Sequence, residues 1–400
     1  MLFQTLDDKS ECVGIYCDDK LVFDPEQFPE ELTATWKYCT YLKHLENVEY
    51  ANLYLQGQPV ENIIPEYLQD DWGDVSSKIQ AFQRSLIISK VDRTENCFFD
   101  LVPERYLVDF CRVKNDITKY ILSNHTRPTR YDFLLKVCQL LEEISNRRLN
   151  INQRKLKSYE KVLNRSFGQN HYISYNQFGT VTGRLTTLKS SFPVLTIRKD
   201  MRSVVEPVND KFLEFDFNGA EARVLMGILG KKQPPEDIHD FHMNEVFEGK
   251  LTREQSKTAF FAWLYGARKI NQSSEGQKLK LFYDKDTVVQ KHWDGKTVLT
   301  PLGKTISGVD QHHALNYIVQ STTAELTLLQ AIKINHLLQT QGNGSFISCL
   351  IHDSIVIDLD NNDNHLVGKI KTLMESTKFG TFGVNISEGK NLGRLEKIEY

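Results

Sequence analysis

Four side chains near residue 260 recur at every fourth position and could bind one ligand together. They are, in order, Arg253, Lys257, Phe261 and Tyr265. The surrounding stretch 251–268 contains no proline, and Thr252 is placed as an N-cap, so we expect a helix of about four turns. At about 100° per residue, positions four apart drift by only about 40° and share one slanting stripe. Two cations followed by two aromatic rings suit a ligand with a polyphosphate and a flat base, although an amphipathic core helix with two solvated cations shows the same pattern.

Two aspartates far apart in the sequence stand where the strands of one sheet could bring them together. KFLEFD predicts a short strand that ends at Asp216, and SFISCLI and SIVIDL predict a hairpin with Asp353 at its tip. Paired carboxylates can hold two Mg²⁺ ions about 3.5–4 Å apart, the requirement of in-line phosphoryl or nucleotidyl transfer. Taken singly, either aspartate is better explained as a turn or cap residue, so this hypothesis depends on their convergence.

Three further side chains are candidates for contacts to a nucleic acid. HHALNYIVQSTTAELTLLQAI predicts a helix on which Asn316 and Gln320 are i,i+4 neighbours. Such amides can read base edges or sugars in a minor groove, although satisfied surface amides have the same spacing. Arg184 lies among small residues that let a backbone approach closely while the guanidinium reaches out. A plain surface loop is the simpler explanation for that segment in isolation.

The overall composition is that of an ordinary globular protein. The 400 residues are 40% hydrophobic and 25% charged, which predicts two or three domains with ample core. No apolar run approaches the length of about 20 residues that spans a bilayer, and the acidic start MLFQTLDDK is unlike a secretory signal. The seven cysteines form no CxxC pair, so we expect free thiols in a reducing compartment and no zinc site.

Charge is distributed unevenly along the chain, although the formal net charge is only −3. Residues 1–110 carry 9 Lys and Arg against 21 Asp and Glu, whereas residues 144–204 carry 12 against 2. Such a basic segment could neutralise the phosphates of a nucleic acid, but a charge run is more often a solvated face. The acidic first third would repel DNA and suits a protein partner or a solvated surface.

The first 110 residues predict a small α/β domain without catalytic residues. FQTL and VGIYC predict a hairpin, LVF predicts a further strand, and the segments 28–45 and 76–88 predict helices. Neighbouring acids such as Asp7 and Asp8 would point to opposite faces of a strand, so we interpret them as turn residues. Residues 113–165 predict helices with basic and apolar faces.

Four segments, in this order and spacing, resemble the motifs of family A DNA polymerases, the DNA polymerase I group. TGRL (182–185) resembles the loop between thumb and palm, DFNGAEARVL (216–225) the first palm motif, RxxxKxxxFxxxYG (253–266) the fingers helix, and LIHDS (350–354) the second palm motif. Weaker similarity lies in 237–247 and 314–321, and the resemblance covers about residues 113–400. It implies an α+β right-hand fold: an antiparallel palm sheet, helical fingers and thumb, and a small α/β N-terminal domain.

The resemblance also implies domain bounds and residue roles. The domains would be the N-terminal domain (1–112), thumb and thumb–palm connection (113–204), palm (205–230 and 296–400) and fingers (231–295). The activity implied is template-directed addition of deoxyribonucleotides to a primer 3′-OH, with primer–template DNA, dNTPs and two Mg²⁺ ions as partners. The metal ligands would be Asp216, Asp353 and the backbone carbonyl of Phe217; the nucleotide contacts Arg253, Lys257, His239, Phe261, Tyr265 and Glu221, the last excluding a ribose 2′-OH; and the DNA contacts Arg184, Asn316, Gln320, His352 and Arg223, with phosphate contacts from 144–204.

Three departures from the family pattern qualify these expectations. Ser354 stands where the family has Glu, the continuation TTLKSSFPVLTI after TGRL is unusual, and the first predicted strand carries no Asp-x-Glu of a proofreading exonuclease. We therefore predict no 3′→5′ exonuclease activity, and a location in a bacterial or phage-infected cytoplasm. Two alternatives stay open: a polymerase of the same fold that uses an RNA template or ribonucleotides, and a catalytically weak accessory subunit that clamps DNA.

Overall fold

The computed structural model describes residues 1–9, 11–92, 95–163 and 171–399, and the chain forms two compact units, Met1–Asn146 and Arg147–Tyr400. Helix α3 (Glu104–Asn124) runs without interruption through the domain boundary expected at 112/113. The family resemblance, which begins at about residue 113, therefore starts inside this helix. The chain divides instead after α4 (Tyr131–Ser145).

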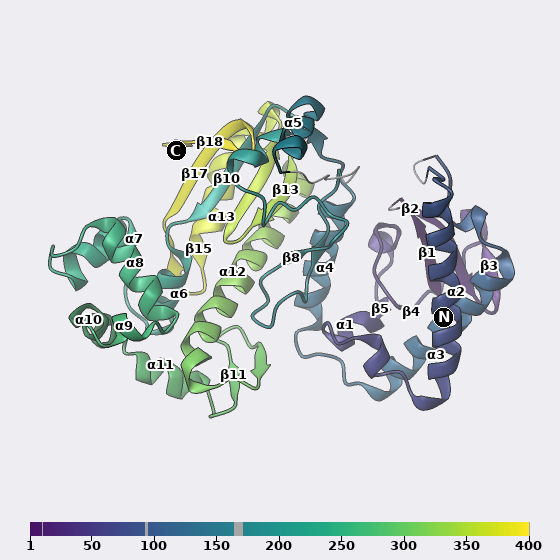
Figure 1. The fold of residues 1–400 in the computed structure, drawn as a ribbon, viewed down its shortest axis with the longest axis horizontal. Helices are drawn as coiled ribbons and strands as arrows, with labels where there is room; N and C mark the ends of the chain where they lie inside the picture. The colour runs from purple at the N-terminus through teal and green to yellow at the C-terminus, as the bar shows by residue number, and fades with distance from the viewer. Residues whose placement is uncertain (10, 93–94, 164–170, 400) are drawn as a thin grey trace. The chain divides into compact units, whose positions relative to one another are not determined.

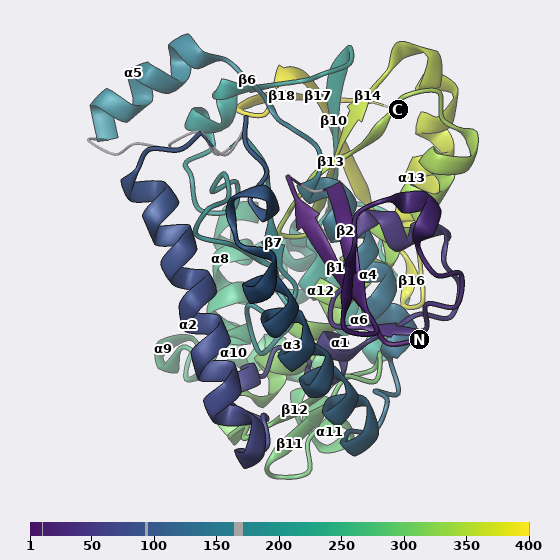
Figure 2. The ribbon, with the colours of Figure 1, turned by 90° about the vertical axis from the view of Figure 1, so that its right-hand side faces the viewer.

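The N-terminal unit contains a three-stranded antiparallel meander in the order β1-β2-β3. The expected hairpin and third strand are confirmed as β1 (Gln4–Asp8), β2 (Glu11–Cys17) and β3 (Lys20–Val22). Helices α2 (Glu66–Ile88) and α3 lie side by side in this unit (Figure 2). Their packed faces, together with α1 (Ala51–Leu55), enclose an apolar cluster.

The helix expected over 28–45 is wrong. That stretch contains the short strand β4 (Ala34–Thr35), which pairs in parallel with β5 (Glu49–Tyr50), and a 3₁₀ turn, η2 (Thr40–His44). Pairing with a neighbouring segment satisfies the backbone there, and it outweighed a weak local pattern. Further 3₁₀ turns of this unit are η1 (Pro25–Gln27), η3 (Val60–Asn62) and η4 (Phe99–Leu101).

The second unit is built on a five-stranded antiparallel sheet in the order β13-β14-β10-β17-β18. The strands are β10 (Lys211–Phe217), β13 (Phe346–Ile351), β14 (Ser354–Leu359), β17 (Val384–Asn391) and β18 (Arg394–Ile398). On the central strand β10, Leu213, Phe215 and Phe217 are buried. Because side chains alternate along a strand, Glu214 and Asp216 share the opposite face.

Helices cover one face of this sheet (Figure 1). The long helix α12 (Gln311–Gln341) packs against β13, β14 and α6 (Ala220–Ile228), and α13 (Val367–Glu375) packs against β17. The antiparallel sheet, its helical cover and the small α/β unit confirm the predicted fold class.

A group of helices between β10 and α12 packs around its own core, which includes Phe260, Trp263 and Tyr283. In it α8 (Arg253–Leu264) begins as predicted at Thr252, whose side chain and Gln255 form a reciprocal capping box. The helix ends before Gly266, which has φ 78° and packs so closely on His312 that an added Cβ would lie 2.6 Å from its ring. The other helices of this group are α7 (Ile238–Phe241), a π-turn η6 (His242–Val246), α9 (Arg268–Asn271), α10 (Ser274–Tyr283) and α11 (Lys285–His292).

Short elements complete the second unit. Part of the basic stretch 144–204 forms α5 (Gln153–Leu163), while its residues 164–170 lie outside the described residues. No helix in the described part of the chain could cross a membrane. All seven cysteines lie in the described ranges and are free, as expected. The remaining elements are the pairs β6 (Asn150–Ile151) with β9 (Val205–Glu206), β7 (Tyr175–Asn176) with β8 (Thr186–Thr187), β11 (Thr297–Leu299) with β12 (Thr305–Ser307) and β15 (Ser376–Thr377) with β16 (Gly380–Thr381), and the turns η5 (Asp200–Val204) and η7 (Asn361–Leu366).

Candidate active site

The two predicted aspartates are brought together by the pairing of β10 with β14. Asp216, near the end of β10, lies directly opposite Ser354, and Asp353 precedes Ser354 in the two-residue turn between β13 and β14. His352 takes the left-handed conformation, φ 57°, that this turn requires. Two carboxylates 137 positions apart in the chain therefore stand at one end of the sheet.

The electrostatics of this pair favour a cation. Burial, and then the negative charges of Asp353 and Glu214, raise the pKa of Asp216 to about 7. Burial also raises the pKa of Asp353. A cation between two such carboxylates would relieve their repulsion, so the residues present fit a divalent metal. Among the described residues no three or more His, Cys, Asp or Glu side chains are grouped to hold one, so any metal here depends on these two carboxylates and on backbone oxygen.

On α8, the second cation of the predicted stripe, Lys257, acts on the two aspartates. Lys257 is exposed, and its positive charge lowers the pKa of both Asp216 and Asp353. Further along the stripe, the rings of Phe261 and Tyr265 are stacked, with centroids 6.1 Å apart and planes inclined by 17°. Tyr265 is 43% exposed, so part of its side chain can contact a ligand.

The first cation of the stripe is not free. The Arg253 guanidinium donates from Nε and Nη2 to the two carboxylate oxygens of Asp237, at 3.1 and 2.7 Å. Burial alone would raise the pKa of Asp237, but the hydrogen bonds from Arg253 and Asn218 hold it below its ordinary value. Asp237 also caps α7 by accepting from the backbone N–H of His239. Sequence reasoning missed Asp237, although its position before IHDF is an N-cap signal.

His239 lies on α7, next to the stripe. It is 3% exposed, and its ring centroid is 5.9 Å from that of Phe261. Burial lowers its pKa to about 4, so the imidazole is neutral at pH 7. Its Nδ1 is buried and has no hydrogen-bond partner among the residues that the structure describes. A buried nitrogen without a partner is energetically costly.

Glu221 joins three of the sequence motifs. Its Oε1 accepts from Arg184 Nη2 at 2.7 Å, and the Tyr265 hydroxyl donates to Oε1 at 3.2 Å. The Glu221 side chain is 6% exposed, and burial raises its pKa against the opposing effect of Arg184. Arg184 comes from the TGRL loop, Glu221 from the start of α6 and Tyr265 from the end of α8.

The remaining predicted DNA contacts divide into two groups. Asn316 and Gln320 are half-buried on α12, and Asn316 Oδ1 is buried with no hydrogen-bond partner in the described ranges. His352 is exposed at the hairpin turn. His352 is therefore open to a ligand, whereas Asn316 Oδ1 is covered by the protein.

The structure contradicts the prediction that Arg223 contacts DNA. Its side chain is 0% exposed and donates to the carbonyl oxygens of Asn218, Pro234 and Glu236. A further bond reaches Asn218 Oδ1. The guanidinium therefore ties the start of α6 to the segment before α7, and it has no surface left for a phosphate.

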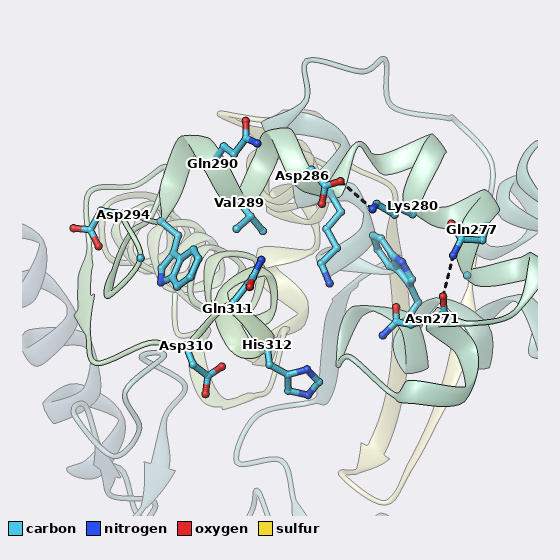
Figure 3. A pocket seen from close by; sticks show the side chains of 15 residues that line it. Asn271, Gln277, Lys280, Asp286, Val289, Gln290, Asp294, Asp310, Gln311 and His312 are labelled. Atoms are coloured by element: carbon cyan, nitrogen blue, oxygen red, sulfur yellow. Dashed lines mark hydrogen bonds and ion pairs between the residues drawn. The ribbon is translucent and has the colours of Figure 1, made fainter.

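A cavity of about 1100 Å³ lies on the other side of α8 (Figure 3). It is lined by Trp263, which at about 100° per residue lies on the face of α8 opposite Phe261. Lys280 points into it but pairs with Asp286 at 3.0 Å. The cavity is lined by both acids and lysines, and the predicted nucleotide and metal residues do not line it.

Two known proteins are similar to part of this chain in sequence. No family model matches the chain. It is 24% identical over 226 residues to DNA polymerase I of Aquifex aeolicus (strain VF5), which is 47% of this chain and 39% of that protein. It is 25% identical over 262 residues to the DNA polymerase of Bacillus phage SP01, which is 51% of this chain and 28% of that protein. Well under two thirds of either relative is therefore spanned.

A solved structure matches almost the whole chain. The POL domain of Pol1 from M. smegmatis, in complex with DNA primer-template and dNTP, superposes with a TM-score of 0.65 over 98% of this chain and 95% of that chain, at 11% identity. The chain has the fold of a DNA polymerase I polymerase domain. The resemblance to family A DNA polymerases is confirmed, because the sequence similarity and the fold agree on it.

Proposed function

We propose that this protein is a template-directed DNA polymerase that adds deoxyribonucleotides to a primer 3′-OH by two-metal nucleotidyl transfer. One observation carries the proposal: Asp216 and Asp353 stand together at the end of the sheet, within the electrostatic reach of Lys257 on α8. The named relatives are DNA polymerases, and the matching solved structure holds primer-template and dNTP, which supports the same reaction.

Asp216 and Asp353 would hold Mg²⁺ in this reaction, with the backbone carbonyl of Phe217 as a further ligand. When bound, two such ions lower the pKa of an attacking hydroxyl and stabilise the leaving group. The raised pKa of Asp216 fits this role, since the carboxylate is ready to exchange its proton for a metal near neutral pH.

The stripe on α8 would deliver the nucleotide. Lys257 is exposed and available to a triphosphate, and Arg253 is held by Asp237 with its guanidinium already oriented. The neutral His239, which packs beside Phe261, would help to bind the triphosphate. Phe261 and Tyr265 would pack against the sugar and base. Removing one preorganised donor of this kind typically costs about 10²–10³ in rate.

Glu221 would select the sugar. Its carboxylate is fixed between Arg184 and Tyr265, so it cannot turn aside easily to admit a 2′-OH. Arg184, Asn316, Gln320 and His352 would contact the primer–template near the reacting end, and the described cations of 144–204 its phosphates. In this assignment 113–204 would supply the thumb and connection, although 113–146 lie in the N-terminal compact unit; 205–230 and 296–400 would form the palm and 231–295 the fingers.

The proposal includes the absence of 3′→5′ proofreading. The first 110 residues contain one Asp-x-Glu triplet, at Asp24–Glu26, where Asp24 accepts from the backbone N–H of Glu26 at the start of η1. Asp8, on the first strand, accepts from the backbone N–H of Phe98. These acids have structural partners, and this supports the view that 1–112 binds a protein partner or serves as a scaffold. A bacterial or phage-infected cytoplasm fits the sources of both relatives.

Primer extension tests the proposal directly. Wild-type protein, Asp216→Ala and Asp353→Ala are compared on a primed DNA template with each dNTP, with and without Mg²⁺. We expect template-matched extension that needs Mg²⁺, and extension lost in both variants while binding to primer–template persists. Extension that survives in Asp353→Ala would refute the metal assignment.

Two alternatives are decided by the same assay. Equal use of dATP and ATP would favour a ribonucleotide polymerase of this fold, and preference for an RNA template would favour a reverse transcriptase. Tight DNA binding by wild-type protein without extension would favour an accessory subunit. Mg²⁺-dependent shortening of a single-stranded primer would contradict the predicted lack of proofreading.

A further inference from the structure

Glu214 is an acid at the candidate active site that the family resemblance does not assign. It precedes Asp216 by two residues on β10, so both side chains stand on the same face of the sheet. The Ser354 hydroxyl donates to Glu214 Oε1 at 3.1 Å across the β10–β14 pair. Among the residues described, no Lys or Arg forms an ion pair with this half-buried carboxylate.

The strand register explains this contact. Asp216 lies directly opposite Ser354, and Glu214 lies opposite Val356. Glu214 and Ser354 are therefore diagonal neighbours on one face, a spacing that a glutamate side chain can cross. Ser354 is itself 3% exposed, so its hydroxyl is directed to Glu214 and to the carbonyl of Ile351 rather than to solvent.

We propose that Glu214 supplies the acid that position 354 lacks. The inference rests on the proposed two-metal polymerase function. Where the family resemblance leads us to expect a glutamate after Asp353, this chain has a serine, and the hydroxyl of that serine donates to a carboxylate from the neighbouring strand. Glu214 acts as a positioning residue: it adds a third negative charge beside Asp216 and Asp353, and it fixes the start of β14 through Ser354.

The charge balance supports this role. Glu214 raises the pKa of Asp216, so its negative charge reaches that carboxylate. Lys257 and Lys199 lower the pKa of Asp216, and Arg184 and Lys257 lower that of Asp353, so cations surround these acids as well. If Glu214 only joined the two strands, a neutral glutamine could accept the same hydrogen bond from Ser354 without the cost of a third negative charge. An excess negative charge beside a pair of acids is instead what strengthens binding of a divalent cation.

Mn²⁺ binding to the full chain, followed by the electron paramagnetic resonance signal of the free ion, tests the inference without relying on extension. We expect Glu214→Gln to weaken Mn²⁺ binding by about 10–100-fold, the range for loss of a residue that supports a metal ligand. Glu388→Gln is the matched control, because Glu388 is an acid of the same sheet that pairs with Lys211 at 2.7 Å. It should bind Mn²⁺ as wild type does.

A relocation variant distinguishes this role from a purely structural one. Glu214→Gln combined with Ser354→Glu returns an acid to the neighbouring strand, and we expect Mn²⁺ affinity within about threefold of wild type, since the charge count is restored. Affinity in Glu214→Gln equal to that in Glu388→Gln, or no recovery in the double variant, would overturn the inference. Wild-type protein that binds Mn²⁺ with this dependence on Glu214 but does not extend a primer would refute the polymerase proposal and leave the acid relocation standing.

Discussion

Replacing Arg223 by lysine separates a structural role from a DNA contact. Arg223 is fully buried and makes four hydrogen bonds, three to backbone carbonyl oxygens between 2.7 and 2.8 Å and one to Asn218 Oδ1 at 3.1 Å. The acceptors lie on two segments, 218 and 234–236. A guanidinium spans them because its donors form a rigid fork, whereas an ammonium is a single point that cannot reach both.

The magnitude follows from the acceptors that lose their donor. Hydrogen bonds to a charged group contribute about 1.5–3 kcal/mol each, and a buried carbonyl left without a partner costs about 1–3 kcal/mol. A lysine that reaches one segment leaves at least one acceptor of the other segment unsatisfied. Because the losses are not additive, we expect Arg223→Lys to lower the free energy of unfolding by about 3–5 kcal/mol.

Urea unfolding and DNA binding at several salt concentrations measure the two roles separately. The control is Lys157→Ala, since Lys157 is exposed on α5 in the basic stretch. If Lys157 contacts a phosphate, its loss should reduce the slope of log K against log salt by about 0.9, with little change in stability. Arg223→Lys should instead lower the stability and leave the salt slope of DNA binding unchanged.

The reasoning is refuted if Arg223→Lys unfolds at the same urea concentration as wild type. It is also refuted if this variant lowers the salt slope as Lys157→Ala does. Either result would mean that the guanidinium is free to reach a phosphate.

Three further predictions follow from the same contacts. Glu221→Ala should reduce the preference for dNTP over NTP by about tenfold or more, the scale of one steric contact, and Tyr265→Phe should have a weaker effect because Arg184 still holds the carboxylate. An unchanged dNTP/NTP ratio of kcat/KM in Glu221→Ala would show that Glu221 does not select the sugar. His239 has a folded-state pKa of about 4 against an ordinary 6.5, so its contribution to stability is present above pH 6.5 and is lost as pH falls toward 4. Between pH 7 and pH 5, the free energy of unfolding in urea should fall by about 2 kcal/mol more for wild type than for His239→Gln, and equal decreases would count against a neutral buried imidazole. Asp237→Asn should lower the free energy of unfolding by about 2 kcal/mol at pH 7 and raise the KM for dNTP, because Arg253 loses its charged partner. An unaltered KM would show that Arg253 does not need Asp237 to bind the nucleotide.

Local patterns predicted the elements that carry the candidate site. The N-cap at Thr252, the strand ending at Asp216 and the hairpin around Asp353 were each predictable, because caps and side-chain alternation act over a few residues. The segment 28–45 was misjudged for the same reason: its pairing partner, β5, lies outside the window that a local pattern samples.

Contacts between distant segments could not be read in the same way. Arg223 and Arg253 are both cations near motif positions, yet one is buried against three carbonyl oxygens and the other is clamped by Asp237. Their partners lie 5 to 16 positions away and depend on how the chain turns back after α6. The family resemblance assigned Arg223 to DNA, and the stripe assigned Arg253 to a ligand, but neither pattern could reveal these partners within the protein.

The sequence by itself determined the order of the motifs, the α+β class and the residue types that would meet a nucleotide and a metal. Only the tertiary structure decided that β14 lies beside β10, and with it that Asp216 meets Asp353 and that Ser354 holds Glu214. The physical reason is that strand order is set by packing over the whole unit, whereas periodicity and capping report only on neighbours along the chain.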